Sequence, residues 1–288
     1  MTDNRRAPLS FEAHIRRGAQ ALTTSPTPSL DARILMKHAA GLDDGAMIAR
    51  SSEIPTSETL LAFGEAIERR RNEEPIAYII GSHEFWSLNF KVSPDVLIPR
   101  PDSECLIETV LDARSDKQQP LGILDLGTGS GCLLIALLSE YPNATGIGVD
   151  ASLSALQIAT DNARRLGIGE RVNFIRSDWC EKVEGVFDVI LANPPYICDG
   201  DILPNSVREF EPADALFAGR DGLDAYRSIL PQLEKHLRDH TILIGECAST
   251  QVKPLAAMVS ETLPSAEIAP IFDLESKPRG VFCKIFAT

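Results

Sequence analysis

The stretch Gly122-Ile-Leu-Asp-Leu-Gly-Thr-Gly-Ser-Gly131 joins a short apolar run to a loop in which every second residue is glycine. Its first half, Gly122 to Leu126, predicts a buried strand, and an apolar helix is expected from Ser130 to Glu140. Glycines between a strand and a helix allow a tight turn and let the backbone approach a ligand closely. The spacing is G-x-G-x-G, whereas the dinucleotide fingerprint is G-x-G-x-x-G. We therefore predict a small-molecule site at Gly127, Thr128, Gly129, Ser130 and Gly131.

From this stretch to the C-terminus, strand patterns and helix patterns alternate. Predicted strands cover residues 122–126, 145–149, 172–176, 187–192, 241–245, 268–272 and 281–286. Predicted helices cover residues 130–140, 152–166, 224–238 and 252–263. Such alternation is typical of an α/β fold with a doubly wound, mostly parallel sheet. The last two strands have no helix between them, so one of them is expected to be antiparallel.

Acidic residues follow two of these predicted strands. Asp150 lies 19 residues after Gly131, a position that reaches ribose hydroxyls in a βαβ unit. Asp178 and Trp179 follow the next strand, where a carboxylate can hold an adenine amino group and an indole can stack on its ring. Each residue also has a structural interpretation, as a helix cap or a surface side chain. Their occurrence at successive strand ends favours a nucleoside site.

The segment Asn193-Pro-Pro-Tyr196 ends the apolar run Phe187–Ala192. Prolines have no backbone N–H and stop a sheet ladder, so their carbonyl groups are left for other partners. A carboxamide, free carbonyls and an aromatic ring suit a planar group whose NH₂ must be held and oriented. We assign acceptor roles to the Asn193 side-chain oxygen and the Pro194 carbonyl, with Tyr196 against the planar face of the substrate. An ordinary Pro-Pro turn is the alternative interpretation.

The 288-residue chain is acidic, and its charge is unevenly distributed. Residues 1–92 contain 11 basic and 12 acidic residues, a net charge of −1, and residues 93–288 contain 17 and 29, a net charge of −12. An acidic surface repels phosphate backbones, so we expect no direct nucleic-acid partner. No apolar run approaches about 18 residues, and the start is polar and contains arginine. We therefore expect no membrane partner and a cytoplasmic location.

The six cysteines, at positions 105, 132, 180, 198, 247 and 283, show no C-x-x-C spacing and lie mostly in apolar segments. This pattern predicts reduced, buried thiols rather than disulfides or a metal site. The sequence also has no Ser-His-Asp set, no metal-ligand cluster and no Walker lysine that would suggest a different chemistry.

Residues 1–80 have the pattern of short helices. Ser10 can cap a first helix, while Leu30, Ile34 and His38 predict the apolar face of a second. A third helix is predicted from Ser57 to Arg71; the triplet Arg69–Arg71 suits its C-terminal dipole, and a partner-binding patch is the alternative. Residues 84–92 alternate with period two, as a strand with one buried face does. We divide the chain into a helical domain (1–82), a connector (83–98) and a main domain (99–288).

Motifs along nearly the whole chain resemble the PrmC/HemK family. They are Gly81-Ser-His-Glu-Phe-Trp-Ser-Leu88, Ser93-Pro-Asp-Val-Leu-Ile-Pro-Arg-Pro-Asp-Ser-Glu104, Ser177-Asp-Trp179, Asn193-Pro-Pro-Tyr-Ile197, Phe210-Glu-Pro212, Ala215-Leu-Phe-Ala-Gly219 and Asp221-Gly-Leu-Asp-Ala-Tyr-Arg227. The chain departs from the family pattern at Ala248 and Ser276, where glycine is common. Both positions lie outside the cofactor and substrate motifs, so the departures concern local loop geometry.

The resemblance implies a Rossmann-like class I S-adenosylmethionine methyltransferase domain, with a small all-α N-terminal domain for substrate recognition and a β-hairpin connector. The family methylates the side-chain N5 of the glutamine in the Gly-Gly-Gln motif of peptide-chain release factors, which act in translation termination. Residues 127–131, Asp150, Trp179 and Asn193 would line the cofactor, and Arg100 would lie near its methionine end. Asn193, Pro194, Pro195 and Tyr196 would hold the substrate glutamine. We expect a monomer.

Other functions remain open from the sequence alone. A nucleic-acid amino-methyltransferase acting on adenine N6 or guanine N2 shares Asn-Pro-Pro-Tyr but calls for a basic groove. A catalytically silent binding protein would be expected to have a broken cofactor loop or a lost Asn-Pro-Pro, and a nicotinamide-dependent dehydrogenase would have different glycine spacing. The segment from Ile197 to Asp221 is long for a loop, which favours a lid. We expect it to clamp the release factor together with the N-terminal helices.

Overall fold

A computed structural model describes residues 9–286, which divide into two compact units. The first unit extends to Gly81 and also includes Pro204–Phe210, and the second comprises Ser82–Leu203 and the residues from Glu211 onward. The three sequence-based domain boundaries stay a prediction. No helix within residues 9–286 combines the length and the apolar character that a membrane span requires.

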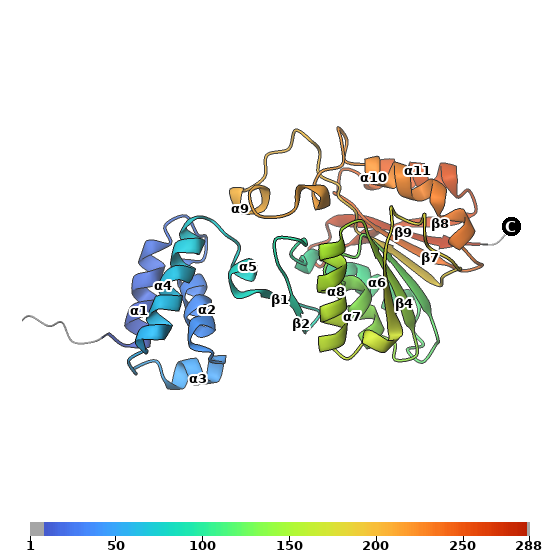
Figure 1. Ribbon diagram of the computed structural model, residues 1–288. Helices are drawn as coiled ribbons and strands as arrows, with labels where there is room; N and C mark the ends of the chain where they lie inside the picture. Colours follow the sequence, from blue (N-terminus) through green and yellow to red (C-terminus); the bar gives the residue numbers. More distant parts are fainter. Residues whose placement is uncertain (1–8, 287–288) are drawn as a thin grey trace, which may run out of the picture. The chain divides into compact units, whose positions relative to one another are not determined.

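The first unit is helical, with α1 (Phe11–Ala21), α2 (Pro28–Ala40), α3 (Asp44–Ala49), α4 (Ser57–Arg71) and α5 (Ile76–Ile80) (Figure 1). Ser10 caps α1 as expected, because its side chain accepts a hydrogen bond from Ala13 N. The predicted face of α2 was wrong: Leu30 is 55% exposed, and Leu35 and Met36 enter the core instead.

Each arginine of the triplet that ends α4 forms an ion pair within the first unit. Arg69 lies 2.5 Å from Glu74, Arg70 lies 2.7 Å from the buried Asp31, and Arg71 lies 2.6 Å from Glu68. The Arg70 pair joins α4 to α2, and Asp31 also accepts hydrogen bonds from the hydroxyls of Ser25 and Thr27. The Arg70 guanidinium therefore stabilises the helical unit itself.

The second unit begins with a β-hairpin, β1 (Ser82–Phe85) and β2 (Leu88–Lys91). The prediction of one continuous strand over residues 84–92 was wrong because the chain reverses at Trp86 and Ser87, whose φ angles are +53° and +57°. Neither is a glycine or asparagine, the residues that normally mark such a turn. The hairpin is held by Asn162, whose side chain accepts from Lys91 N at 2.7 Å and donates to Lys91 O at 3.0 Å.

The sheet of the second unit has seven strands in the order β5-β4-β3-β6-β7-β9-β8. They are β3 (Gly122–Leu126), β4 (Thr145–Asp150), β5 (Val172–Arg176), β6 (Val189–Ala192), β7 (Ile242–Glu246), β8 (Ala266–Phe272) and β9 (Pro278–Ile285). All neighbours are parallel except those of β9, which runs antiparallel to β7 and β8 as the missing crossover helix predicts. This is the Rossmann-like fold expected from the sequence.

Helices cover both faces of this sheet (Figure 1). They are α6 (Glu104–Ala113), α7 (Cys132–Glu140) and α8 (Leu153–Arg165) on one face, and α10 (Asp224–Ile229) and α11 (Val252–Thr262) on the other, with one buried apolar core beneath each layer. The short α9 (Asn205–Arg208) belongs to the first unit. The helix predicted over residues 224–238 ends early, at Ile229, and 3₁₀ turns follow it. Pro231 explains the break because it has no N–H to donate to Arg227 O.

The strand order reverses at β3, which lies between β4 and β6 in the sheet. Both β4 and β6 pair with β3 in parallel, and the chain crosses from one side of β3 to the other between β5 and β6. A ligand site in an open α/β sheet lies at the carboxyl ends of the strands where the order reverses. The site must therefore be sought at the ends of β3, β4 and β6.

Candidate active site

The glycine loop turns sharply from β3 to α7. Gly127 N and Thr128 N both donate to Val149 O, at 2.9 and 2.8 Å, which holds the loop against the end of β4. Gly127, Gly129 and Gly131 have φ angles of +74°, +54° and +80°, a region that L-residues with a side chain avoid. The alternation of glycines in the sequence is thus required by the backbone of the loop.

Asp150 ties the end of β4 to this loop. Its Oδ2 accepts from Gly129 N at 2.9 Å, and its Oδ1 accepts from Ser152 N at 2.9 Å. Burial raises the pKa of Asp150, and the backbone donors oppose that rise. Each carboxylate oxygen has a second lone pair, so the side chain can accept further hydrogen bonds from a ligand's hydroxyl groups.

Asp125 lies beneath the loop and contacts it directly. It is the fourth residue of β3 and accepts a hydrogen bond of 2.6 Å from the Thr128 hydroxyl. Burial, together with the nearby charge of Asp150, raises the pKa of Asp125 to about 7. Asp125 lines the same cavity as Asp150, a position that no pattern in the sequence indicated.

Asp178 and Trp179 follow β5, one strand beyond Asp150. Asp178 is exposed, whereas Trp179 is half-buried and has a φ angle of +46°. A Cβ atom placed on Gly127 would lie 3.5 Å from the Trp179 ring. The indole therefore packs against the first glycine of the loop, where it can form one wall of a flat pocket for a planar ring.

Asn193 follows β6 directly, and Pro194 and Pro195 come next, outside the sheet. Leu191 and Ala192 pair with Asp125 and Leu126 of β3, so Asn193 lies at the same edge as the glycine loop. Tyr196 does not line the cavity to which the other three contribute, and its hydroxyl donates to Oε1 of Glu246, at the end of β7, over 3.2 Å. The four residues of the motif therefore do not all face one space.

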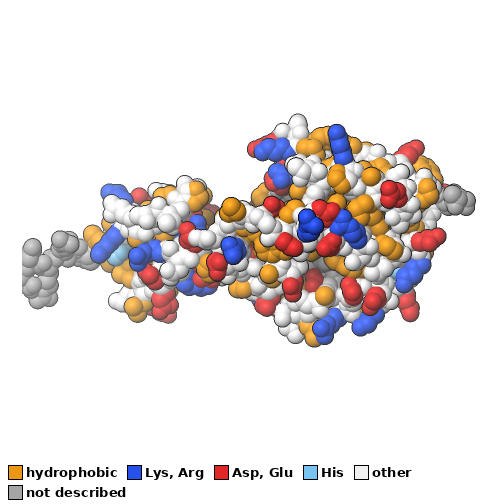
Figure 2. Space-filling model, turned by 90° about the horizontal axis from the view of Figure 1, so that it is seen from above, with side chains coloured by type: hydrophobic (Ala, Val, Ile, Leu, Met, Phe, Trp, Pro, Cys, Tyr) orange, Lys and Arg blue, Asp and Glu red, His pale blue; other side chains and the backbone are white. Residues whose placement is uncertain are grey.

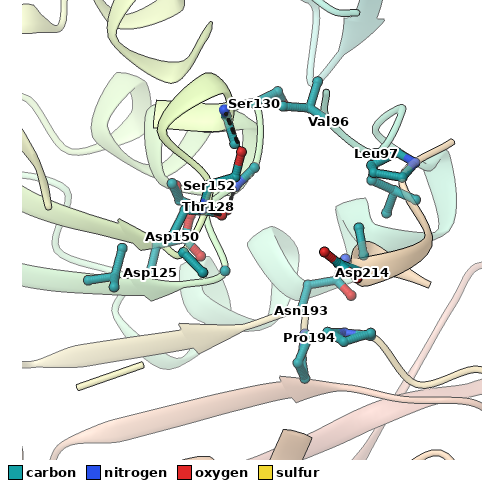
Figure 3. A pocket seen from close by; sticks show the side chains of 18 of the residues that line it. Val96, Leu97, Asp125, Thr128, Ser130, Asp150, Ser152, Asn193, Pro194 and Asp214 are labelled. Carbon is teal, nitrogen blue, oxygen red and sulfur yellow. Dashed lines mark hydrogen bonds between the residues drawn. The ribbon is translucent and has the colours of Figure 1, made fainter. Parts of the chain in front are cut away.

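A cavity of about 590 Å³ lies at this edge of the sheet (Figure 3). Its lining contains most of the site residues predicted from the sequence, namely Arg100, Gly127, Thr128, Gly129, Ser130, Asp150, Asp178, Trp179, Asn193, Pro194 and Pro195. Thr128 and Asp150 lie on one side of the cavity, and Asn193, Pro194 and Asp214 lie across from them (Figure 3). The cavity is therefore bounded by residues from β3 and β4, by the glycine loop and by the segment after β6.

Two predicted residues, Gly131 and Tyr196, are outside the lining. A Cβ atom on Gly131 would lie 3.0 Å from Ile135 and 3.3 Å from Ala159, so this glycine permits close packing of the loop on α8. The Tyr196 side chain is directed toward Glu246.

Ser103 lines the cavity and was missed by the sequence analysis. The hydroxyls of Ser103 and Ser130 are both buried and have no hydrogen-bond partner within residues 9–286. A buried polar atom without a partner is costly, so these two hydroxyls are suited to contacts with a polar ligand. The only sequence signal for Ser103 was its place in the motif that contains Arg100.

Arg100 is held at the rim of the cavity by Glu211, the central residue of Phe210-Glu-Pro212. The Glu211 carboxylate is buried, accepts from the Arg100 guanidinium at 2.5 Å, and also accepts from Ile98 N at 3.3 Å. Because Arg100 has five N–H donors, it retains donors for an anionic ligand group.

The cavity fits S-adenosylmethionine by its chemistry. Asp150 offers acceptors for ribose hydroxyls, Trp179 offers a ring face for adenine, and Arg100 offers cationic donors for a carboxylate. The volume of about 590 Å³ lies within the usual range for sites that enclose a ligand of this size. No group of three or more His, Cys, Asp or Glu side chains in residues 9–286 is arranged to hold a metal ion. All six cysteines are free, and four of them are buried.

Comparison with known proteins is consistent with this geometry. The family model described as the PrmC N-terminal domain matches residues 14–81, and that of the methyltransferase small domain matches residues 101–214. The release factor glutamine methyltransferase of Bradyrhizobium diazoefficiens is 40% identical over 88% of this chain and 86% of its own length. That of Nitratidesulfovibrio vulgaris is 34% identical over 94% and 92%.

Solved structures support the fold. The human Mettl16 catalytic domain, in complex with an RNA hairpin of the MAT2A 3′UTR, has a TM-score of 0.55 over 100% of this chain and 95% of that one, at 15% identity. A Thermus thermophilus 16S rRNA N2 G1207 methyltransferase, solved with AdoMet and guanosine, has a TM-score of 0.53 over 71% and 49%, at 18% identity. These two structures bear on the fold alone. The relatives that are 34–40% identical over most of their length show that the chain belongs to the release factor glutamine methyltransferase family.

Proposed function

We propose that this enzyme transfers a methyl group from S-adenosylmethionine to the side-chain N5 of the glutamine in the Gly-Gly-Gln motif of peptide-chain release factors. The observation that carries the proposal is the position of Asn193 and Pro194 across one cavity from the glycine loop and Asp150. A cofactor bound between the loop and Asp150 would present its methionine end toward Asn193. The family of the chain supports the substrate.

Positioning is the main task of the residues around the substrate nitrogen. An amide nitrogen is a poor nucleophile because its lone pair is delocalised into the carbonyl group. Two acceptors on its two N–H groups, the Asn193 side-chain oxygen and the Pro194 carbonyl, would hold the nitrogen with its lone pair toward the cavity. When bound, S-adenosylmethionine would supply a methyl group on a positively charged sulfur. The N–C bond would form as the S–C bond breaks, which leaves S-adenosylhomocysteine, and the nitrogen would release one proton to solvent.

The cofactor contacts divide among three strand ends. Asp150 would accept hydrogen bonds from the ribose hydroxyls, and Trp179 would pack on the adenine ring. Arg100, oriented by Glu211, would bind the carboxylate of the methionine end. Ser103 and Ser130 would each gain a polar partner that they lack within the described part of the chain.

The helical unit and the segment after β6 are proposed to recognise the release factor as a protein. In support, Pro204–Phe210 belongs to the helical unit, although it lies in sequence between β6 and α10. Deletion of residues 1–80 should then reduce methylation of the release factor far more than cofactor binding. Equal methylation without them would contradict this role.

A nucleic-acid substrate is the second candidate, favoured only by the shared Asn-Pro-Pro-Tyr motif. The charge of −12 over residues 93–288 argues against it. On the face seen in Figure 2, lysine and arginine side chains lie among aspartate and glutamate side chains. A cytoplasmic location and a monomeric state stay predictions, and light scattering after size-exclusion chromatography would measure the latter.

The test is methyl transfer from labelled S-adenosylmethionine to a purified release factor, beside its Gln→Ala variant in the Gly-Gly-Gln motif. We expect label on the wild-type factor alone. In the Asn193→Ala enzyme, kcat should fall about 100-fold or more while the enzyme still binds the cofactor. DNA and ribosomal RNA serve as parallel substrates. Label on nucleic acid instead would move the function to the second candidate.

A further inference from the structure

Two polar groups of Tyr196 are held by residues at the end of β7 and just before α11. The hydroxyl of Tyr196 donates to Glu246 Oε1 at 3.2 Å, and its backbone carbonyl accepts from Gln251 Nε2 at 2.8 Å. Glu246 is the last residue of β7, and Gln251 immediately precedes α11. Tyr196 is thus fixed at its side chain and its backbone by residues at least 50 positions away.

Gln251 is 6% exposed, and both the oxygen and the nitrogen of its side-chain amide form hydrogen bonds. Its Oε1 accepts from Ala248 N at 3.0 Å, and its Nε2 donates to Tyr196 O and Asp221 O, each at 2.8 Å. The side chain therefore joins the two ends of the segment between β6 and α10. Ala248 contributes only its backbone N–H, which explains why the departure from glycine there leaves the contact intact.

Glu246 is 4% exposed, and its second oxygen, Oε2, has no hydrogen-bond partner within residues 9–286. The carboxyl group is therefore buried, with the Tyr196 hydroxyl donating to Oε1 and the Ser103 hydroxyl close enough to lower its pKa. Burial raises the pKa of Glu246 to about 7. The hydroxyl of Tyr226 donates to the Glu246 carbonyl at 2.5 Å and lies 3.3 Å from Ala192 O, which joins the ends of β7 and β6.

We propose that Glu246 and Gln251 are positioning residues for methyl transfer, which act by fixing Tyr196 and so the backbone of Asn193 and Pro194. This inference rests on the proposed function. Tyr196 is separated from the Pro194 carbonyl by a single residue, and that residue is a proline with a constrained φ angle. A displacement of Tyr196 would therefore move the acceptors for the substrate amide.

A merely structural role predicts a different outcome. Loss of general stability would lower cofactor binding and activity together, whereas loss of positioning would lower kcat with cofactor affinity unchanged. Thr241, which immediately precedes β7 on the side opposite Glu246, offers a matched control. Its buried hydroxyl donates to Phe187 O at 2.7 Å and accepts from Arg238 N at 2.9 Å, away from the cavity.

The experiment compares four variants of the full chain, Gln251→Met, Glu246→Leu, Glu246→Gln and Thr241→Val. For each, kcat and KM are measured with a release factor, and Kd is measured calorimetrically with S-adenosylhomocysteine. We expect Gln251→Met and Glu246→Leu to lower kcat about ten- to a hundredfold with Kd changed by less than about threefold. Glu246→Gln keeps an oxygen acceptor for Tyr196, so its kcat should stay within about threefold of wild type.

Three results would overturn the inference. These are an unchanged kcat in both Gln251→Met and Glu246→Leu, an equal loss of kcat in Thr241→Val, and an equal loss in Glu246→Gln and Glu246→Leu. If Gln251→Met fails to fold, the two Glu246 variants decide alone. The wild-type enzyme separates this inference from the proposed function: if it transfers no label to the release factor, the proposed function itself is wrong.

Discussion

The Glu211 carboxylate accepts a hydrogen bond of 2.5 Å from the Arg100 guanidinium, although 111 residues separate the two in the chain. The partners differ in their surroundings: the Glu211 side chain is 1% exposed, and the Arg100 side chain is 35% exposed. A charge left without its partner in the interior is far more costly than one that water can reach. The two halves of this ion pair should therefore respond differently to substitution.

We expect Arg100→Met to lower the free energy of unfolding by about 3–5 kcal/mol, because it leaves the Glu211 carboxylate buried and unpaired. Glu211→Gln should cost less, about 1–3 kcal/mol. Urea unfolding followed by tryptophan fluorescence measures both, since Trp86 and Trp179 lie in the second unit. Lys91→Met is the control, because it breaks an exposed pair with Asp161 and should cost less than about 1 kcal/mol. Equal losses for Arg100→Met and Glu211→Gln would contradict the argument from burial.

Asp150→Ala should weaken cofactor binding by about ten- to a hundredfold. The substitution removes the proposed acceptor for ribose hydroxyls and also frees Gly129 N and Ser152 N, which the carboxylate now holds. Calorimetric titration with S-adenosylhomocysteine measures the affinity. Asp161→Ala, on the exposed part of α8, should leave that affinity unchanged. If Asp150→Ala binds S-adenosylhomocysteine as tightly as the wild type, the nucleoside does not bind at Asp150.

The buried Asp125 should make the free protein less stable as the pH rises. Its pKa in the folded state is raised to about 7 from an ordinary value of 3.8, so the folded protein holds a proton that the unfolded chain has already lost. This contribution to stability is complete below about pH 4 and is lost as the pH rises toward about 7. Asp125→Asn removes the titrating group but keeps an acceptor for Thr128.

Urea unfolding at about pH 5 and about pH 8 checks this expectation. From about pH 5 to about pH 8, the free energy of unfolding of the wild type should fall by about 2–3 kcal/mol more than that of Asp125→Asn. Glu246 titrates in the same window in both proteins, so the difference between them isolates Asp125. The same pH dependence in both proteins would show that Asp125 is ionised in the folded state throughout.

Gly222→Ala should disturb the contact between Tyr196 and Gln251. A Cβ atom at this position would lie 2.1 Å from Tyr196 O and 2.2 Å from Gln251 Nε2, and the φ angle of Gly222 is +71°. Gly167 has a similar φ angle of +74° but no atom within 4 Å of the corresponding position. Gly167→Ala should therefore cost only the backbone strain, about 1–2 kcal/mol, and leave kcat unchanged.

Gly222→Ala should add the steric conflict to that strain and lower kcat as Gln251→Met does. Thermal unfolding and steady-state kinetics of the two alanine variants separate the effects. If both variants lose the same stability and keep full kcat, the close approach at Gly222 does not position Tyr196.

Much of the second unit could be predicted from sequence because its signals are local. The short apolar runs of β3 to β6 predict strands without any information from distant residues. The glycines at 127, 129 and 131 have positive φ angles that their own loop requires. Asp150 and Asn193 could be assigned to one site because each lies at the carboxyl end of a parallel strand. The carboxyl ends of neighbouring parallel strands meet at one edge of the sheet.

The contacts that orient these residues depend on the tertiary structure. Glu211 with Arg100 and Gln251 with Tyr196 connect positions 111 and 55 residues apart, and the turn at Trp86 and Ser87 carries no glycine or asparagine to mark it. Strand order and loop paths bring such residues together. The periodicity of apolar residues along the chain does not show which distant residues will meet. The sequence by itself determined the strands of the seven-stranded sheet, the glycine loop and the Asn-Pro-Pro-Tyr motif. Only the packed structure decided that Ser103 enters the cavity while Tyr196 turns to Glu246, because burial of each side chain depends on neighbours distant in the chain.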